Sequence, residues 1–369
     1  MRTRRLLVLG VAVAMLAIPL ALAGCGSPSA QSTGSGTPAA FNGAALNGAG
    51  ATFPGPVYSQ WAQSFTKVES GAQVNYQAIG SGGGVQQFTA KTVDFGATDV
   101  SLLASETAKV SGAFIQFPTC LGAVVVSYNL PDVTTPLSLD GATIANIFLG
   151  RIKKWNDPAI AALNSGVTLP ATAIQVVHRA DGSGTTSIFT SWLKGQSPDW
   201  ASKVGSGKSV QWPVGQGGNG NAGVAAAMKQ TAGSIGYLEL QYAAGAGLGV
   251  ASVKAPGGTF VVPSVDSVAK AASGLAFPIT ETTNILDSKV AGAYPISSTT
   301  YILIYTNQTD QAKAQTLVDF WTWALTKGQA ELATLKYASL PDSIAKASLA
   351  EVAKITVNGK PVTPSPSVK

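Results

Sequence analysis

Three turns rich in Gly, Ser and Thr constrain the fold of this chain more than any other feature. They are residues 48–54 (GAGATFP), 80–84 (GSGGG) and 179–186 (RADGSGTT). Each precedes a run with helical hydrophobic periodicity, and the second and third also follow strand-like runs. Gly suits such turns because it accepts backbone conformations that other residues avoid. A chain that repeats strand, Gly-rich turn and helix is typical of the α/β class.

The runs around these turns predict individual elements. Apolar or alternating stretches predict strands over residues 73–79, 123–128, 174–178, 234–240 and 299–305. Apolar residues at three- and four-residue spacing predict helices over residues 57–65, 188–193 and 317–324. We interpret these apolar stripes as core positions rather than cofactor sites.

Length and composition limit the classes of function. The chain has 369 residues, 46% of them hydrophobic, which favours a large interior divided into two domains and excludes intrinsic disorder. Charged residues make up only 11%, and the formal net charge of +6 includes Arg2, Arg4 and Arg5 at the N-terminus. Nucleic-acid-binding domains carry a stronger basic surplus, so we expect no nucleic-acid partner.

The N-terminus resembles a bacterial lipoprotein signal. Basic residues precede an apolar run over residues 6–22, which leads into residues 22–25 (LAGC). The run is short for a membrane-spanning helix and carries Pro19 near its end. The resemblance implies that residues 1–24 are a signal peptide and that the thiol of Cys25 carries a diacylglycerol, with palmitate as a fatty-acid component of the lipid modification. Residues 25–42 would then be the lipidated Cys and a flexible tether that connects an extracytoplasmic protein to its lipid anchor in the cell membrane.

The Gly-rich turns also carry the candidate chemistry. Free backbone N–H groups and the helix dipole make the start of a helix favourable for an anion. The hydroxyls of Thr52, Ser81, Ser183 and Thr185 and the guanidinium of Arg179 would add further donors. Together the three turns predict an anion-binding cradle.

Over nearly its whole length the chain resembles the phosphate-binding lipoproteins of bacterial ABC phosphate importers. The motifs that carry the resemblance are residues 48–54, 79–84 (IGSGGG), 93–99 (VDFGATD), 179–185 (RADGSGT), 233–237 (GSIGY) and 337–341 (YASLP). The resemblance implies an α/β fold with mixed sheets and helices on both faces. This is the two-lobe periplasmic binding protein clamp of type II, with the ligand in the cleft between the lobes. It also implies a solute-binding protein that captures inorganic phosphate for a membrane ABC permease, with no catalysis, no cofactor and no metal.

The same resemblance implies a set of phosphate contacts. They would be Thr52, Phe53 through its backbone N–H, Ser81, Asp99, Arg179, Ser183, Gly184 and Thr185. Two positions depart from the family pattern. Gly82 stands where many relatives have a second Ser, and His178 precedes Arg179 where a second Arg is frequent. Neither replaces a direct contact, so we expect the ligand to be unchanged.

Asp99 looks out of place in an anion site, because an ionised carboxylate near pH 7 only accepts hydrogen bonds. Phosphate keeps at least one proton near neutral pH, and its P–OH can donate to Asp99, whereas fully ionised sulfate has no proton to offer. We therefore predict that Asp99 excludes sulfate. Arg179 would supply a fixed fork of donors, held by a salt bridge to Asp181. The alternative role for Asp99 is a helix N-cap before residues 101–103.

Other chemistries fit less well. Residues 218–223 (GNGNAG) match a dinucleotide-binding fingerprint with Glu239 about 20 residues on, but turn-rich residues 212–217 precede them in place of a clean strand. Residues 207–209 (GKS) resemble the end of a P-loop, yet position 202 is not Gly.

An enzyme or a zinc site lacks the necessary ligands. A phosphatase would need a metal cluster or a nucleophile with a base, and His178 is the only histidine. Of the two cysteines, Cys25 belongs to the lipoprotein signal, and Cys120 is predicted to be a buried, unreactive thiol without a disulfide. The alternative to a phosphate receptor is a receptor for another tetrahedral oxyanion. A secreted phosphatase is the third and least favoured interpretation.

The remaining expectations concern boundaries and surfaces. We expect residues 43–118 with 294–369 to form the first lobe, residues 119–293 to form the second, and the protein to be a monomer. Residues 150–155 (GRIKKW) are the densest basic cluster, which fits a solvated surface, a permease contact or an attraction for anions equally well. Residues 361–369 are expected to form a frayed tail.

Overall fold

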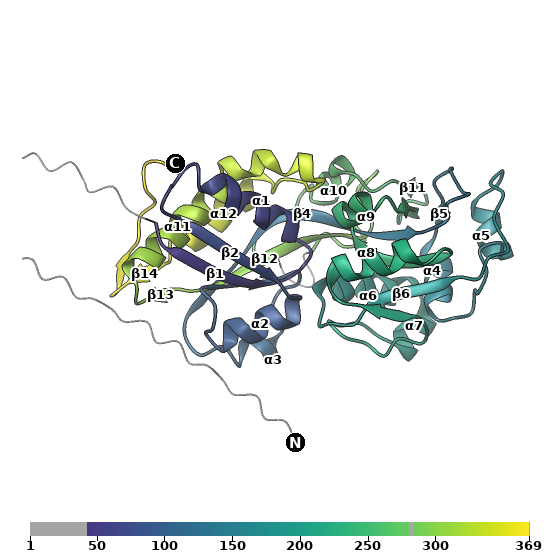
Figure 1. The fold of residues 1–369 in the computed structure, drawn as a ribbon, viewed down its shortest axis with the longest axis horizontal. Coiled ribbons are helices and arrows are strands. Elements are labelled where there is room, and N and C mark those ends of the chain that lie inside the picture. Colours follow the sequence, from purple (N-terminus) through teal and green to yellow (C-terminus); the bar gives the residue numbers. More distant parts are fainter. Residues whose placement is uncertain (1–42, 280–283, 369) are drawn as a thin grey trace, which may run out of the picture. The chain divides into compact units, whose positions relative to one another are not determined.

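The computed structural model describes residues 43–279 and 284–368, which belong to one compact unit of the chain (Figure 1). The predicted signal peptide, the predicted lipidation site Cys25 and the whole of the predicted tether lie outside the described residues. No helix within the described ranges is long and apolar enough to cross a membrane.

One mixed sheet organises the described residues. Its nine strands there follow the order β2-β1-β3-β12-β4-β8-β6-β7, with β9 paired to β4. Their bounds are β1 (Ala45–Gly50), β2 (Gln73–Ala78), β3 (Phe95–Thr98), β4 (Phe114–Tyr128), β6 (Gln175–Arg179), β7 (Gln216–Gly218), β8 (Ser234–Glu239), β9 (Gly249–Val250) and β12 (Ser297–Tyr305). Strands β1, β2 and β3 run parallel, as do β6, β7 and β8. We call the part with β1–β3 the first half and the part with β6–β8 the second half.

Strand β4 belongs to both halves. Its residues from Phe114 to Ala123 pair with β12, which continues to β3, and its residues from Val124 to Tyr128 pair with β8. The sequence predicted only the second part of this strand. Pro118 lies where the register of β4 and β12 shifts, and a proline at such an irregularity interrupts the strand pattern in the sequence without ending the strand.

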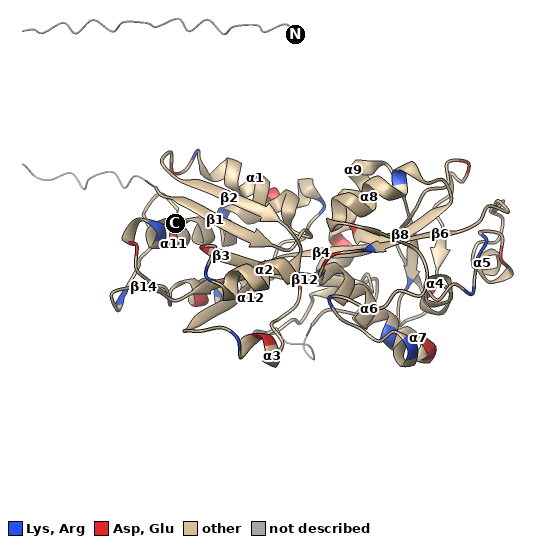
Figure 2. Cartoon of the chain, turned by 60° about the horizontal axis from the view of Figure 1, so that its bottom comes forward, with Lys and Arg blue, Asp and Glu red and all other residues tan. Residues whose placement is uncertain are grey.

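Helices cover both faces of the sheet. They are α1 (Gly55–Phe65), α2 (Ser81–Thr89), α3 (Ala104–Thr107), α4 (Gly141–Phe148), α5 (Pro158–Leu163), α6 (Gly184–Gln196), α7 (Pro198–Lys203), α8 (Gly220–Gln230), α9 (Leu240–Ala246), α10 (Val265–Ala271), α11 (Gln311–Leu325) and α12 (Asp342–Val352). In the first half α1 and α2 lie on opposite sides of the strands, and in the second half α8 and α6 do (Figures 1 and 2). The helices predicted over residues 57–65, 188–193 and 317–324 are α1, part of α6 and part of α11.

Smaller elements complete the fold. They are β5 (Ser138–Leu139), β10 (Ser252–Lys254), β11 (Phe260–Val261), β13 (Asn307–Gln308), β14 (Thr356–Val357), β15 (Lys360–Pro361) and the 3-10 turns Lys327–Glu331 and Ala333–Leu335. Most charged residues lie outside the central strands (Figure 2). Cys120 is fully buried in β4 as predicted, and burial raises the pKa of its thiol far above the ordinary value.

The C-terminal residues do not form the frayed tail that the sequence predicted. Val362 and Val368 are buried in the core. The backbone N–H of Ser365 donates to Oδ1 of Asp319 at 2.7 Å, and its hydroxyl donates to Oδ2 at 2.7 Å. Asp319 is fully buried on α11 and needs such donors, so it holds this segment against the helix.

Candidate functional site

The candidate residues meet where parallel strands end. Thr52 and Phe53 follow β1, Ser81 begins α2 after β2, and Asp99 directly follows β3. In the second half Arg179 ends β6, and α6 begins five residues later. Because parallel strands bring their carboxyl ends to one edge of a sheet, each half gathers its share of the site at such an edge.

Backbone contacts bring these two edges together. The N–H of Gly82 donates to the carbonyl of Gly182 at 2.8 Å. A Cβ on Gly184 would lie 2.5 Å from Oδ2 of Asp99 and 2.5 Å from the hydroxyl of Ser81. The start of α6 therefore lies directly against Asp99 and Ser81, at a distance that only Gly permits.

The candidate side chains are almost entirely buried. Ser81, Ser183 and Thr185 are fully buried, while Asp99, Arg179 and Thr52 are 1%, 3% and 5% exposed. Phe53 is also fully buried, with its carbonyl held by the hydroxyl of Tyr337 at 2.6 Å. Charges and dipoles act more strongly in such a water-poor site than in solvent.

The first turn of α6 provides helix N–H donors. Ser183 is the N-cap, and its hydroxyl accepts from the backbone N–H of Thr186 at 3.0 Å. That contact leaves the hydroxyl proton of Ser183 free to donate elsewhere, because a hydroxyl both donates and accepts. The N–H groups that open a helix have no partner within it, and the helix dipole adds partial positive charge there.

The guanidinium of Arg179, a planar fork of N–H donors, is held rigidly by its neighbours. Its Nε donates to Oδ1 of Asp181 at 2.7 Å, its Nη2 pairs with Oδ2 at 2.5 Å, and its Nη1 donates to the hydroxyl of Thr185 at 3.3 Å. The predicted salt bridge is thus present in bidentate form. Burial opposes ionisation of Asp181, but the hydrogen bonds and charge of Arg179 outweigh burial and lower its pKa. The guanidinium is held in place while keeping its positive charge.

Asp99 differs from the sequence expectation in its protonation. Burial raises its pKa from 3.8 to about 7, against the opposing effects of Thr300, Arg179 and Ser81. The hydroxyl of Thr300 donates to Oδ1 at 2.9 Å, and that of Ser81 donates to Oδ2 at 3.3 Å. The sequence predicted an acceptor-only carboxylate near pH 7, whereas the buried group titrates near that pH.

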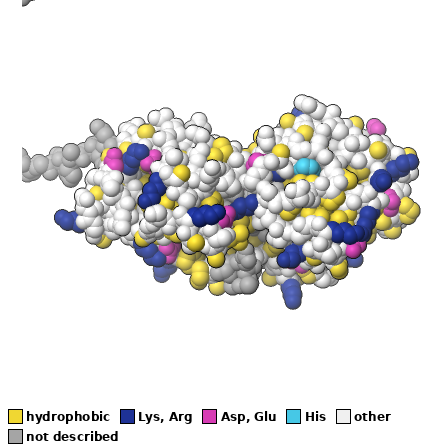
Figure 3. Space-filling model, turned by 90° about the horizontal axis from the view of Figure 1, so that it is seen from below, with side chains coloured by type: hydrophobic (Ala, Val, Ile, Leu, Met, Phe, Trp, Pro, Cys, Tyr) yellow, Lys and Arg dark blue, Asp and Glu magenta, His cyan; other side chains and the backbone are white. Residues whose placement is uncertain are grey.

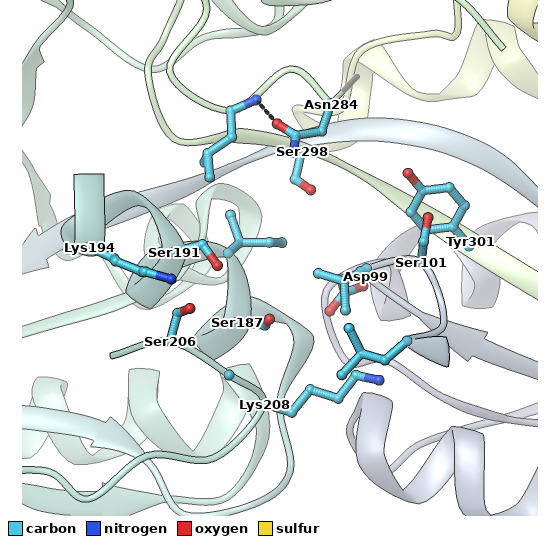
Figure 4. A pocket seen from close by; sticks show the side chains of 15 residues that line it. Asp99, Ser101, Ser187, Ser191, Lys194, Ser206, Lys208, Asn284, Ser298 and Tyr301 are labelled. Atoms are coloured by element: carbon cyan, nitrogen blue, oxygen red, sulfur yellow. Dashed lines mark hydrogen bonds between the residues drawn. The ribbon is translucent and has the colours of Figure 1, made fainter. Parts of the chain in front are cut away.

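A cavity of about 430 Å³ opens beside Asp99 between the two halves. Figure 4 shows Ser187, Ser191 and Lys194 of α6 on one side and Asp99 with Tyr301 on the other. Of the candidate phosphate contacts, all of which lie in the described residues, Asp99 lines this cavity and the others do not. The cavity therefore adjoins the turns that form the cradle without containing them.

Two residues that the sequence analysis did not single out touch this site. Thr300 of β12 bonds Asp99, as described above. Asn221 at the start of α8 donates from Nδ2 to the hydroxyl of Thr52 at 2.9 Å and to that of Thr185 at 3.3 Å. Asn221 lies in the Gly-rich segment 218–223, so a local signal existed, but the pattern pointed to a dinucleotide instead.

The histidine, the P-loop-like segment and the basic cluster considered in the sequence analysis each contact other side chains of the protein. The ring of His178 stacks on Trp212 with centroids 4.9 Å apart. Lys208 of the P-loop-like segment forms an ion pair with Glu106 at 2.5 Å, and Arg151 of the basic cluster pairs with Asp199 on the surface. Basic and acidic side chains are interspersed on the face that Figure 3 shows. Within the described ranges, no three His, Cys, Asp or Glu side chains are close enough to hold a metal ion.

Comparison with known proteins identifies the family. A family model described as a PBP superfamily domain matches residues 27–327. The chain is 43% identical to the phosphate-binding protein PstS of Pasteurella multocida over 302 residues, which cover 81% of this chain and 87% of that protein. It is also 35% identical to PstS of Methanocaldococcus jannaschii over 371 residues, covering 94% of this chain and 95% of that protein. The chain belongs to the PstS family of phosphate-binding proteins.

The fold agrees with this membership. A human phosphate-binding apolipoprotein matches with a TM-score of 0.69 at 22% identity, covering 87% of this chain and 100% of that one. The predicted fold class, an α/β clamp of two lobes, is thereby confirmed.

The two positions that depart from the PstS pattern, Gly82 and His178, both contact neighbouring backbone. Gly82 packs so closely that a Cβ there would lie 3.1 Å from Cα of Gly182. A Ser at this position would therefore press on the opposite half. The Nδ1 atom of His178 lies 3.1 Å from the carbonyl oxygen of Arg179, so the departing residue contacts the backbone of the neighbouring Arg.

Proposed function

We propose that this member of the PstS family captures inorganic phosphate between its two lobes and delivers it to the membrane permease of an ABC importer. One arrangement carries the proposal: the first turn of α6 lies against the buried carboxyl of Asp99, and the rigid Arg179 guanidinium is hydrogen-bonded to Thr185 of that same turn. The fork and the helix start offer donors to an anion, and Asp99 offers an acceptor. Phosphate is the common tetrahedral oxyanion that needs both, because it carries negative oxygens and a proton.

The phosphate contacts of this proposal are those expected from the family resemblance. Thr52, Arg179, Ser183 and Thr185 would donate from their side chains, and Phe53 and Gly184 from their backbone N–H groups. The hydroxyl of Ser81, which donates to Asp99 in the empty site, would turn its proton to the ligand on binding. The P–OH group would donate to ionised Asp99. Sulfate would leave two like charges facing each other in a site without water, so it would be excluded.

Binding and release would involve the lobes rather than any covalent step. We assign residues 43–118 and 294–369 to one lobe and residues 119–293 to the other. Phosphate would draw together the edges that carry Ser81 and Gly184, and opening of the same edges would release it to the permease. In this role the protein acts as a monomer, without a cofactor.

The sequence of the N-terminal residues supports a proposed location at the cell membrane. Residues 1–24 would be removed as a signal peptide, and a lipid on Cys25 would anchor the protein on the extracytoplasmic side. The uncharged tether up to residue 42 would leave the lobes free to reach the permease.

Thermal unfolding with added anions tests the proposal. The purified protein is first unfolded and refolded to strip bound ligand, and is then titrated with sodium phosphate or sodium sulfate at pH 8. A ligand that binds the native state raises its stability by about 1.4 kcal/mol for each tenfold excess over its dissociation constant. We expect a rise in melting temperature with phosphate and none with sulfate. No rise with phosphate would refute the proposed function.

A further inference from the structure

Asn221 bridges the two halves of the site. It is fully buried at the start of α8, in the segment that resembles a dinucleotide fingerprint. We infer that Asn221 is a positioning residue that forces the hydroxyls of Thr52 and Thr185 to donate their protons toward the ligand. This inference deepens the proposed function and rests on it, since it explains how two neutral hydroxyls are committed to an anion.

The amide of Asn221 has a defined orientation. Its Oδ1 accepts the backbone N–H of Glu239 at 3.1 Å. Since a backbone N–H can only donate, the oxygen of the amide must face Glu239 and the NH₂ group must face the hydroxyls. The Nδ2 atom then lies 2.9 Å from the hydroxyl oxygen of Thr52 and 3.3 Å from that of Thr185.

Each hydroxyl receives two N–H donors. Thr52 accepts from Nδ2 and from the backbone N–H of Asn221, the latter at 3.2 Å. Thr185 accepts from Nδ2 and from Nη1 of Arg179, both at 3.3 Å. A hydroxyl has two acceptor positions and one proton. With both acceptor positions occupied, each hydroxyl has only its proton left to offer, which is what a phosphate oxygen requires.

These contacts also explain the Gly-rich turn without a dinucleotide. Its backbone donors are already used within the protein, because Gly220 N–H donates to Oδ1 of Asp181 at 3.0 Å and Asn221 N–H donates to Thr52. Gly220 has a φ of 66°, a left-handed conformation that favours Gly and that directs the chain between these two partners. The turn thus connects Asp181, which holds Arg179, to Thr52 in the opposite half.

The first test replaces Asn221 with Asp in the full-length protein. Asn221→Asp keeps the shape but turns an NH₂ donor into an acceptor, so the hydroxyl protons would turn toward the new carboxylate and away from phosphate. We expect the dissociation constant for phosphate, measured by isothermal titration calorimetry, to rise at least about 100-fold. The matched control is Asn219→Asp, which adds the same charge two residues away on an exposed side chain that makes no capping hydrogen bond. It should stay within about threefold of the wild type, since exposed charges are largely screened.

The second test separates positioning from a general structural role. Asn221→Ala is introduced into the wild type, into Thr52→Ser and into Thr52→Val, and phosphate affinity is measured in all backgrounds. If Asn221 acts through the Thr52 hydroxyl, Asn221→Ala should weaken binding at least about tenfold in the wild type and in Thr52→Ser, and clearly less in Thr52→Val. An equal loss in all three backgrounds would overturn the inference, as would unchanged affinity in Asn221→Asp. If the wild type itself fails to bind phosphate, the proposed function fails with it, so the two failures are distinguishable.

Discussion

Replacing Asp99 with Asn should change both the stability of the empty site and its choice of anion. Burial raises the pKa of Asp99 from 3.8 to about 7, so keeping its carboxyl ionised in the empty site costs about 4 kcal/mol. The native state holds this proton between about pH 4 and pH 7 while the unfolded chain releases it. The contribution of Asp99 to stability is therefore complete below pH 4 and is lost as the pH rises through 7.

Asp99→Asn removes this pH dependence. At pH 8, without ligand, we expect the variant to be more stable than the wild type by up to about 4 kcal/mol, and at pH 4 we expect the two to be similar. Urea unfolding across this range measures the difference. Asp132→Asn, which removes a carboxylate from an exposed position, is the matched control and should show no such gain. Glu69 and Glu239 also have raised pKa values, so only part of the slope should disappear.

The same variant should bind sulfate. The amide of Asn can donate to a sulfate oxygen, so the penalty of two facing charges disappears, and the dissociation constant for sulfate at pH 8 should fall at least about 100-fold. Phosphate should still bind, because the Arg179 fork and the start of α6 are unchanged. Titration calorimetry with phosphate and with sulfate measures both dissociation constants in the wild type and in the variant. Unchanged sulfate exclusion in Asp99→Asn would refute the role that we assign to this carboxyl.

Three further predictions concern the same site. Gly184→Ala would place a methyl group 2.5 Å from Oδ2 of Asp99, so phosphate affinity should fall at least about 100-fold by calorimetry. Gly195→Ala, on the same helix with open space around it, should keep that affinity and raise stability by about 0.5 to 1 kcal/mol, and equal behaviour of the two variants would contradict the close approach. Arg179→Lys should lose the bidentate contact to Asp181 and weaken phosphate binding about 100-fold, and a loss below about threefold would show that the fork is dispensable. In the wild type, sulfate binding should appear as the pH falls from 8 to 5, because protonated Asp99 can donate, and a melting temperature in sulfate that stays equal to the sulfate-free value at every pH would argue against this mechanism.

The fold was largely predictable from local patterns. Apolar periodicity placed α1, α6 and α11, and apolar runs placed β2, β6, β8 and β12, because the two periods differ and the elements are long enough to show them. The first part of β4 was not predicted, because Pro118 interrupts the apolar run where the register with β12 shifts. The packing of the C-terminal segment was not predicted either, because Ser365 binds Asp319, which is 46 residues away in the sequence.

The site was predictable only in part. The salt bridge of Arg179 to Asp181 joins residues two apart, which a motif can show. Thr300 binds Asp99 from 201 residues away in the sequence, and Asn221 binds Thr52 from 169 residues away. No local sequence pattern indicates contacts over such separations. The protonation of Asp99 depends on burial by both halves together, so an acidic residue alone gave no sign of a pKa near 7.

A crystal structure with phosphate bound tests the central claim most directly. Protein stripped by refolding would be crystallised with phosphate at pH 8. We predict one phosphate at the first turn of α6, with oxygens within hydrogen-bond distance of the Arg179 guanidinium and the Ser183 hydroxyl, and with one oxygen facing the carboxyl of Asp99. A phosphate held in the cavity beside Lys194, away from Arg179, would contradict the account.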